Sequence, residues 1–353
     1  MKFLFLYTEL AEYFISCIHV LCENTNAEIH IVKWPSNIEA PFLFSFSEKI
    51  KIHERKNLHR KSLNELAQKI SPDVIYCSGW IDKEYLNVCN LFRSKIPVIV
   101  GFDNRWKGSF KQQLGASLNK ITIHKYFSHC WIPGNSQMEF AHRIGFDSQH
   151  ILTGFYSCDY NLFHDLYLKC RLKKKKNFPH RFVFVGRYYE FKGIKDLWNT
   201  FIELQNENPN DWELWCLGTG DIEPIVHSKI KHFGFVQPND MEKFIRECGV
   251  FILPSRFEPW GVAVHEFASA GFPLICSNEV GASEMFLKEN ENGFSFNAGN
   301  VLQLKNAMQK FISMRDEQLF EMGERSAELA KQITHDKWAD TLMSIINSQT
   351  IVK

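Results

Sequence analysis

The sequence predicts an α/β protein made of two doubly wound domains. In both halves, short apolar runs alternate with longer stretches of helical periodicity, which is typical of parallel sheets covered on both faces. The length of 353 residues suits two domains of ordinary size. A lysine-rich stretch without apolar periodicity separates the halves. We expect domains over residues 1–170 and 181–335, a linker over 171–180, and a final helix over 336–353.

In the first half, the expected strands are short runs of mainly apolar residues. They are Phe3–Tyr7, Ala27–Val32, Val74–Cys77, Val98–Val100 and Cys130–Ile132. The helices expected between them are Leu10–Cys22, Leu63–Ile70, Glu84–Phe92 and Ser136–Ile144. Four consecutive lysines and a proline in residues 169–179 indicate a solvated connector, with a lipid-binding patch as the alternative.

The second half repeats the alternation. Its expected strands are 181–186, Trp212–Leu217, Ile230–Phe235, Val250–Leu253, Leu274–Ser277 and Gly293–Phe296. Its expected helices are Lys195–Gln205, Met241–Cys248, Val262–Ala270, Val301–Ile312, Glu317–Lys331 and Asp336–Ile346. Each half can therefore form a sheet of its own.

The net charge of +1 conceals an asymmetry. Residues 1–180 hold 24 Lys and Arg against 16 Asp and Glu, whereas residues 181–353 hold 17 against 24. The basic half could face an anionic acceptor or an anionic membrane surface, or the imbalance could be chance. The ten scattered cysteines suit reduced thiols in a cytoplasmic protein. The basic half also allows a peripheral position at the inner face of a membrane. No nucleic-acid partner is expected.

The most informative segment runs from Leu253 to Glu266. It follows a buried strand and places Glu258 and Glu266 eight positions apart, with Pro259 suited to the first turn of a helix. In that arrangement Glu258 lies at the start of the helix, and Glu266 lies roughly 80° away around the axis. A helix N-terminus attracts phosphate, and carboxylates accept hydrogen bonds from hydroxyl groups. Phosphate and hydroxyl groups together describe a nucleotide-sugar.

A second segment places a basic pair after a strand. Gly186 lets the backbone turn tightly, and Arg187 and Lys192 follow near the carboxyl end of the strand, where parallel sheets bind ligands. Their charges suit phosphate oxygens, although two surface cations are the alternative. Gly218 lies in a further glycine turn.

These segments together resemble retaining glycosyltransferase family 4. The resemblance rests on the two glutamates, on the continuation through 270–281 and 291–294, and on the Gly-Arg and Lys-Gly pairs of 186–193. It implies a GT-B fold, in which two Rossmann-like domains face a cleft and the last helix crosses back to the N-terminal domain. It covers most of residues 130–350 and is loose before them.

The resemblance also implies roles for individual residues. Glu258, Arg187 and Lys192 are expected in catalysis, with Glu258 at the donor sugar and the basic pair at the diphosphate. Glu266 is expected at the ribose. The remaining donor-binding residues are expected to be Gly186, Gly218, Phe235, Val236, Trp260, Gly261 and Val262. No Asp-x-Asp occurs in the chain, so neither a metal nor another cofactor is expected.

The N-terminal domain departs from the family pattern. The loop after the first strand, Thr8 to Leu10, lacks the family's glycine, which leaves its approach to phosphate in doubt. Asp103 stands where many members have a histidine, and we expect it to bind an acceptor or sugar hydroxyl or to cap a turn. Arg105 and Trp106 are expected on the acceptor side with it.

The resulting expectation is a metal-independent, retaining hexosyltransferase. It would move a hexose from a UDP- or GDP-sugar to a glycan or lipid-linked acceptor, in bacterial surface polysaccharide synthesis. Two alternatives stay open: a nucleotide-sugar epimerase or hydrolase of the same fold, and a non-catalytic GT-B partner subunit.

Overall fold

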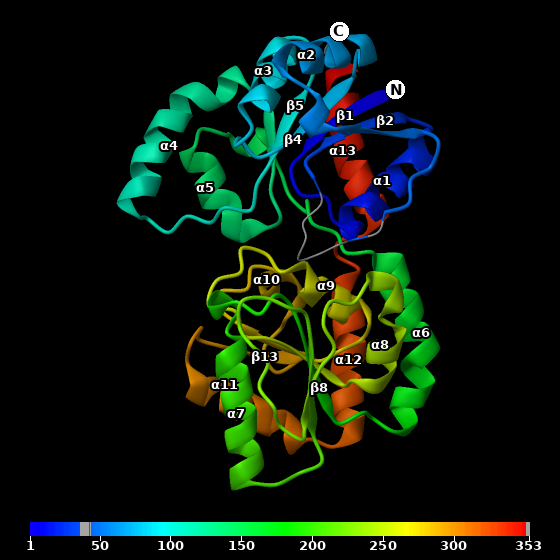
Figure 1. Cartoon of the computed structure of the whole chain (residues 1–353), viewed down its shortest axis with the longest axis vertical. Helices are drawn as coiled ribbons and strands as arrows, with labels where there is room; N and C mark the ends of the chain where they lie inside the picture. Colours follow the sequence, from blue (N-terminus) through cyan, green and yellow to red (C-terminus); the bar gives the residue numbers. More distant parts are fainter. Residues whose placement is uncertain (36–41, 43, 351–353) are drawn as a thin grey trace. The chain divides into compact units, whose positions relative to one another are not determined.

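The computed structural model describes residues 1–35, 42 and 44–350, and its chain divides into two compact units (Figure 1). Unit 1 comprises Met1–Ser157 and His335–Lys353, and unit 2 comprises Cys158–Thr334. Each unit contains one parallel sheet, with seven strands in unit 1 and six in unit 2. The α/β class and the two doubly wound sheets are confirmed.

In unit 1 the strand order is β3-β2-β1-β4-β5-β6-β7. The strands are β1 (Lys2–Tyr7), β2 (Glu28–Lys33), β3 (Ile50–Glu54), β4 (Val74–Ser78), β5 (Val98–Gly101), β6 (His129–Trp131) and β7 (Ile151–Leu152). The helices are α1 (Glu12–Thr25), α2 (Arg60–Ile70), α3 (Lys83–Phe92), α4 (Phe110–Thr122), α5 (Met138–Arg143) and α13 (His335–Thr350). Because the chain runs outward in both directions from β1 and β4, this sheet has a switch point between those two strands.

Two hydrophobic cores cover the two faces of this sheet. On one face, residues of α2, α3 and α5 pack on side chains such as Leu4, Ile75 and Val100. On the other face, α1 and α13 pack on side chains such as Phe5 and Ile31. The alternation of side chains along each strand explains this division, because successive residues point to opposite faces.

In unit 2 the strand order is β10-β9-β8-β11-β12-β13. The strands are β8 (Arg181–Val185), β9 (Glu213–Leu217), β10 (Ile230–His232), β11 (Val250–Leu253), β12 (Leu274–Ser277) and β13 (Gly293–Phe296). The helices are α6 (Tyr160–Lys176), α7 (Ile194–Glu207), α8 (Glu242–Glu247), α9 (Val262–Ser269), α10 (Ser283–Phe286), α11 (Val301–Ile312) and α12 (Asp316–Ala330). The switch point of this sheet lies between β8 and β11.

The expected linker is wrong in position. The chain divides at Ser157 and Cys158, and the lysine run lies in the last turns of α6. Positive charge at a helix C-terminus is favourable because it complements the backbone dipole. Lys174 is buried with its ammonium 3.5 Å from the centre of the Phe272 ring, so the run is not simply a solvated connector.

Two edge strands and three helices account for the other differences. The sequence expectation omitted β3, β7, α4, α6 and α10. The last helix belongs to unit 1, and its described part ends at Thr350, so residues 351–353 of the predicted range lie outside the described residues. No helix of the described part of the chain is long and apolar enough to span a membrane.

Candidate active site

The switch point of unit 2 gathers the predicted donor residues. The loop of 186–193 follows β8, and the loop of 254–261 follows β11, its neighbour in the sheet. Both strands are parallel, so both loops leave from the same edge. The carboxyl edge at such a point is where doubly wound sheets bind ligands.

Lys192 and Glu258 form an ion pair across these two loops. Their side chains are only 17 % and 12 % exposed. The two residues stand 66 positions apart, so only the fold brings them together. Desolvation strengthens the attraction between the charges, and it makes the loss of one partner costly for the other. The predicted catalytic lysine and glutamate are thus one electrostatic unit.

The backbone around Gly193 holds this pair in place. Gly193 has a φ of +68° and precedes α7, and a Cβ atom there would lie 2.2 Å from the carbonyl oxygen of Pro254. The amide of Arg256 donates to the carbonyl of Phe191 at 2.7 Å. The guanidinium of Arg256 also donates to both carboxylate oxygens of Asp196 in α7, at 3.0 Å each. The loop after β11 is therefore fastened to the turn that carries Lys192.

The geometry of the glutamate segment differs from its prediction. The helix α9 begins at Val262, so Pro259 precedes it and Glu258 lies in the loop. Glu258 instead forms a parallel bridge with Val280, and its carbonyl accepts from the amide of Gly281 at 3.0 Å. Because Glu258 and Glu266 do not share one helix, the expected angle of 80° between them does not apply. Gly261, with a φ of +93°, makes the turn into α9.

Glu266 lies in α9 and is partly buried. Burial raises the pKa of its carboxyl to about 7, and the nearby charge of Asp159 contributes. Its carboxylate has no hydrogen-bond partner among the residues that the structure describes. A carboxylate in this setting gains from any hydroxyl group that donates to it.

The glycine turns lie directly beside one another. A Cβ on Gly218, whose φ is +138°, would lie 2.0 Å from the carbonyl oxygen of Gly186. The amide of Gly218 donates to the carbonyl of Gly234 at 2.7 Å. Phe235 and Val236 follow Gly234 in the chain, and both are partly exposed. The turns after β8, β9 and β10 are therefore contiguous. Arg187 directly follows Gly186 in the turn after β8 and is partly exposed.

Trp260 has a different environment from the other predicted donor residues. Its side chain is 1 % exposed and packs edge-on against Phe286. Its carbonyl accepts from the amide of Ala282 at 2.9 Å. The indole is therefore a core group that positions the start of α9, and the contact predicted for Trp260 is one of its backbone N–H group.

In unit 1, the three predicted acceptor-side residues lie in the loop after β5. The carboxylate of Asp103 accepts from the hydroxyl of Tyr156 at 3.4 Å. The carbonyl of Arg105 accepts from Gln112 of α4 at 2.8 Å. Trp106 lies under the guanidinium of Arg143, 4.4 Å from its ring centre. Trp106 also lines a cavity of about 880 Å³ between α4 and α5.

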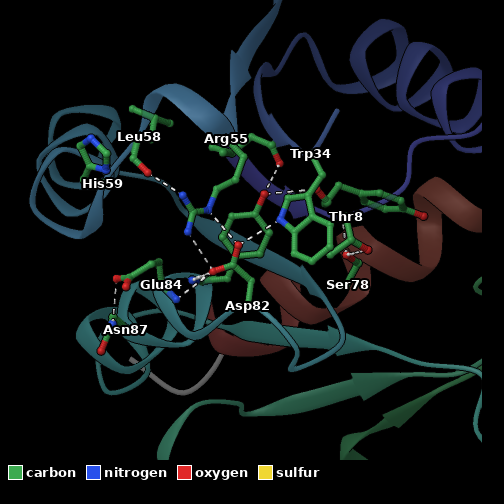
Figure 2. Close-up of polar contacts among 12 residues, drawn as sticks. Thr8, Trp34, Arg55, Leu58, His59, Ser78, Asp82, Glu84 and Asn87 are labelled. Atoms are coloured by element: carbon green, nitrogen blue, oxygen red, sulfur yellow. Dashed lines mark hydrogen bonds and ion pairs between the residues drawn. The ribbon is translucent and has the colours of Figure 1, made fainter. Parts of the chain in front are cut away.

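A polar network that the sequence analysis missed occupies the carboxyl edge of the same sheet (Figure 2). The indole of Trp34 and the guanidinium of Arg55 donate to the carboxylate of Asp82, at 3.0 and 2.8 Å. Burial alone would raise the pKa of Asp82, but these hydrogen bonds lower it. Trp34 and Arg55 directly follow β2 and β3, whereas Asp82 caps the N-terminus of α3, so no single sequence pattern marks the network.

The unit 1 switch point is marked by a pair of hydroxyl groups. The amide of Thr8, which follows β1, donates to the Ser78 hydroxyl at 2.8 Å, and the two hydroxyls are 3.0 Å apart. The loop that lacks the family's glycine is therefore tied to the end of β4. Within the described residues, no group of three His, Cys, Asp or Glu side chains is placed to hold a metal ion.

Comparison with known proteins identifies a family for unit 2. Residues 179–314 match the family model described as glycosyl transferases group 1. An uncharacterized glycosyltransferase of Methanocaldococcus jannaschii is 28 % identical over 120 residues, which are 31 % of this chain and 30 % of that protein. The 2-deoxystreptamine N-acetyl-D-glucosaminyltransferase of Niallia circulans is 28 % identical over 131 residues, 34 % and 32 % of the two chains. The chain thus spans about a third of the length of these relatives.

Solved structures resemble the chain over its whole length. Sucrose-phosphate synthase of Thermosynechococcus elongatus has a TM-score of 0.72 at 14 % identity, with 100 % of both chains covered. HepE of Anabaena, solved in complex with UDP and glucose and with UDP-glucose, has a TM-score of 0.70 at 14 % identity, covering 99 % of this chain and 100 % of that one. These likenesses establish the GT-B fold.

Proposed function

Because residues 179–314 match the family model of glycosyl transferases group 1, we propose that this chain is a metal-independent, retaining glycosyltransferase. It would move a hexose from a UDP- or GDP-sugar to a glycan or lipid-linked acceptor. We place this reaction in the synthesis of a bacterial surface polysaccharide.

The observation that carries the proposal is the Lys192–Glu258 pair at the switch point of unit 2. A lysine ammonium can bind a diphosphate oxygen, and a carboxylate beside it can accept from a sugar hydroxyl. With Arg187 in the same loop as Lys192, the site offers cations for the phosphates and an anion for the hexose. That pairing of charges suits a nucleotide-sugar better than a free nucleotide or a free sugar.

The same charges support a retaining reaction. The bond between C1 of the hexose and the diphosphate oxygen breaks while the acceptor oxygen bonds to C1 on the same face. The acceptor's proton passes to the departing phosphate oxygen, so no enzymic base is needed. Arg187 and Lys192 stabilise the negative charge that develops on the diphosphate, in the role that a metal ion has in other enzymes.

The donor and the acceptor would be held by different features. We assign the ribose to Glu266 and the base to the backbone near Phe235 and Val236. The crystal structures of HepE make UDP and UDP-glucose the first ligands to test. On the acceptor side we assign Asp103, and Trp106 at the cavity of unit 1, because an indole face suits a sugar ring.

A screen of nucleotide-sugars, read by released nucleotide, tests the proposal. One UDP- or GDP-hexose should give UDP or GDP above background, and EDTA should leave the rate unchanged. Lys192→Ala should abolish release, while Lys61→Ala, on the exposed face of α2, should not. An altered monosaccharide without an acceptor would favour an epimerase or hydrolase. No turnover of any donor would favour a non-catalytic subunit.

A further inference from the structure

The outer face of α4 exposes an apolar stripe. Phe110, Leu114 and Leu118 are 81 %, 56 % and 61 % exposed. Their spacing of four residues keeps them within roughly 80° of one another around the helix and extends the stripe over about 12 Å. Large apolar side chains exposed singly are ordinary, whereas three in a row along one helix face indicate a contact surface.

The stripe belongs to a well-formed helix. The hydroxyl of Ser109 caps its N-terminus by accepting from the amide of Gln112 at 3.3 Å. Ala116, on the opposite face of α4, is buried, and α4 packs beside α5 (Figure 1). The helix therefore has an inner face fastened to unit 1, and the stripe is directed away from that contact.

The sequence around the stripe carries positive charge alone. Residues 104–138 contain five Lys and Arg and no Asp or Glu. Lys107 and Lys111 are exposed at the start of α4, and Lys120 and Lys125 are exposed toward its end. An exposed apolar stripe with lysines on both sides is the pattern of helices that lie in the interface of a membrane.

We propose that the α4 surface, defined as Phe110, Leu114, Leu118, Lys107 and Lys111, docks on an anionic lipid bilayer. The apolar side chains would enter the boundary between headgroups and acyl chains, and the lysines would meet the lipid phosphates. The inference does not depend on the proposed function, because its test needs neither donor nor acceptor.

A lipid bilayer fits this surface better than a protein partner does. The acid-free stretch offers no carboxylate to pair with cations of a partner, and a row of three apolar residues is too small for the core of a stable protein interface. A second copy of the chain would bring the same lysines face to face, and like charges repel.

Helix α6 provides the matched comparison. It also exposes two leucines, Leu168 and Leu172, next to lysines. However, Arg171 of α6 pairs with Glu324, Lys174 is buried, and the lysines of its last turn complement the helix dipole. The α6 lysines thus have roles inside unit 2, whereas Phe110, Leu114 and Leu118 of α4 belong to neither hydrophobic core of unit 1.

The first experiment is co-sedimentation of the whole chain with vesicles. The chain should bind phosphatidylcholine vesicles that contain roughly one third phosphatidylglycerol at low salt, and it should dissociate from them at high salt. Phe110→Ser/Leu114→Ser/Leu118→Ser should bind at least about tenfold more weakly. Lys107→Ala/Lys111→Ala should bind roughly twentyfold more weakly at low salt. Leu168→Ser/Leu172→Ser should bind like the parent.

The second experiment uses the burial of all ten native cysteines. A cysteine introduced by Leu114→Cys can be labelled selectively with an environment-sensitive dye, and Leu172→Cys is the matched control. Anionic vesicles should shift the emission of the dye at position 114 to the blue and leave the dye at position 172 unchanged. Unaltered circular dichroism would show that the variants are folded.

Three results would overturn the proposal. One is the absence of vesicle binding by the parent chain at every salt concentration. Another is loss of binding with the α6 variant while the α4 variant binds normally. The third is a dimer in solution that the α4 triple variant breaks while lipid binding is unchanged, which would make the stripe a self-association surface.

Discussion

Lys192 and Glu258 neutralise each other at a position where neither side chain has much access to water. A diphosphate that approaches Lys192 therefore also approaches the Glu258 carboxylate, and the pair must be treated as a unit. Both residues could be predicted, because each lies in a recognisable motif. The contact between them could not be predicted, since a separation of 66 residues in the sequence gives no information about their distance in space.

A double-mutant cycle tests this coupling. Lys192→Ala removes a charge-assisted contact of about 1.5–3 kcal/mol and leaves Glu258 facing the diphosphate unbalanced. We expect UDP binding to weaken about 100-fold or more, and Lys192→Ala/Glu258→Gln to recover at least part of that loss. Calorimetry with UDP measures both. If the double variant bound as weakly as Lys192→Ala, the two residues would act independently.

Glu266 predicts a pH dependence of stability. Its folded pKa of about 7 exceeds the ordinary value, so the folded state binds more protons than the unfolded state between about pH 4.5 and 7. The free energy of unfolding should therefore fall as pH rises through this range, by up to about 3 kcal/mol, and this loss of stability should persist above pH 7. Glu266→Gln should remove it, whereas Glu65→Gln on the exposed face of α2 should not.

Urea unfolding at several pH values measures the effect. The difference in stability between Glu266→Gln and the parent should grow from about pH 5 to about pH 8 and favour the variant. A constant difference would show that the Glu266 carboxyl titrates in its ordinary range.

At the scale of elements, the strands were the most predictable. The strands β11, β12 and β13 have the predicted bounds. The first two are unbroken runs of buried residues, and β13 is buried except at Ser295. The helix α4 was missed because Ala116 is one of its few buried residues, so no apolar periodicity marks the inner face. The start of α9 at Val262 agrees with the expected helix, but the interpretation that put Pro259 in its first turn is wrong, because Gly261 makes the turn into the helix.

Two glycines with the same φ allow the stability cost of a steric contact to be measured apart from the cost of backbone strain. Gly193 and Gly234 both have a φ of +68°, but a Cβ would meet Pro254 at 2.2 Å only in the first case and nothing within 4 Å in the second. Gly234→Ala should cost about 1–2 kcal/mol from its left-handed backbone. Gly193→Ala should cost at least about 1 kcal/mol more and displace Lys192. Equal losses in urea unfolding would show that the contact with Pro254 is relieved easily.

At the scale of the whole molecule, the division into two units with parallel sheets followed from the alternation of apolar and helical stretches. The boundary between the two units could not be predicted in this way, because a lysine run has the same sequence pattern in a linker and at the end of a helix such as α6. The site in unit 2 could largely be predicted because its residues follow strands of one sheet. In unit 1 the network around Asp82 joins residues from three separate strand ends, and no local pattern marks it.

The stereochemistry of the product tests the reaction of the whole chain. If Arg187 and Lys192 stabilise the departing diphosphate on the face that the acceptor approaches, an α-linked donor should give an α-linked product, and NMR of the new linkage will show it. If Glu258 lies at the sugar where positive charge develops, as the proposed function has it, Glu258→Gln should lower turnover, and Glu266→Gln should mainly weaken donor binding. A β-linked product would require a base opposite the leaving group and would point to Asp103. Normal turnover of Glu258→Gln would remove that residue from the catalytic step.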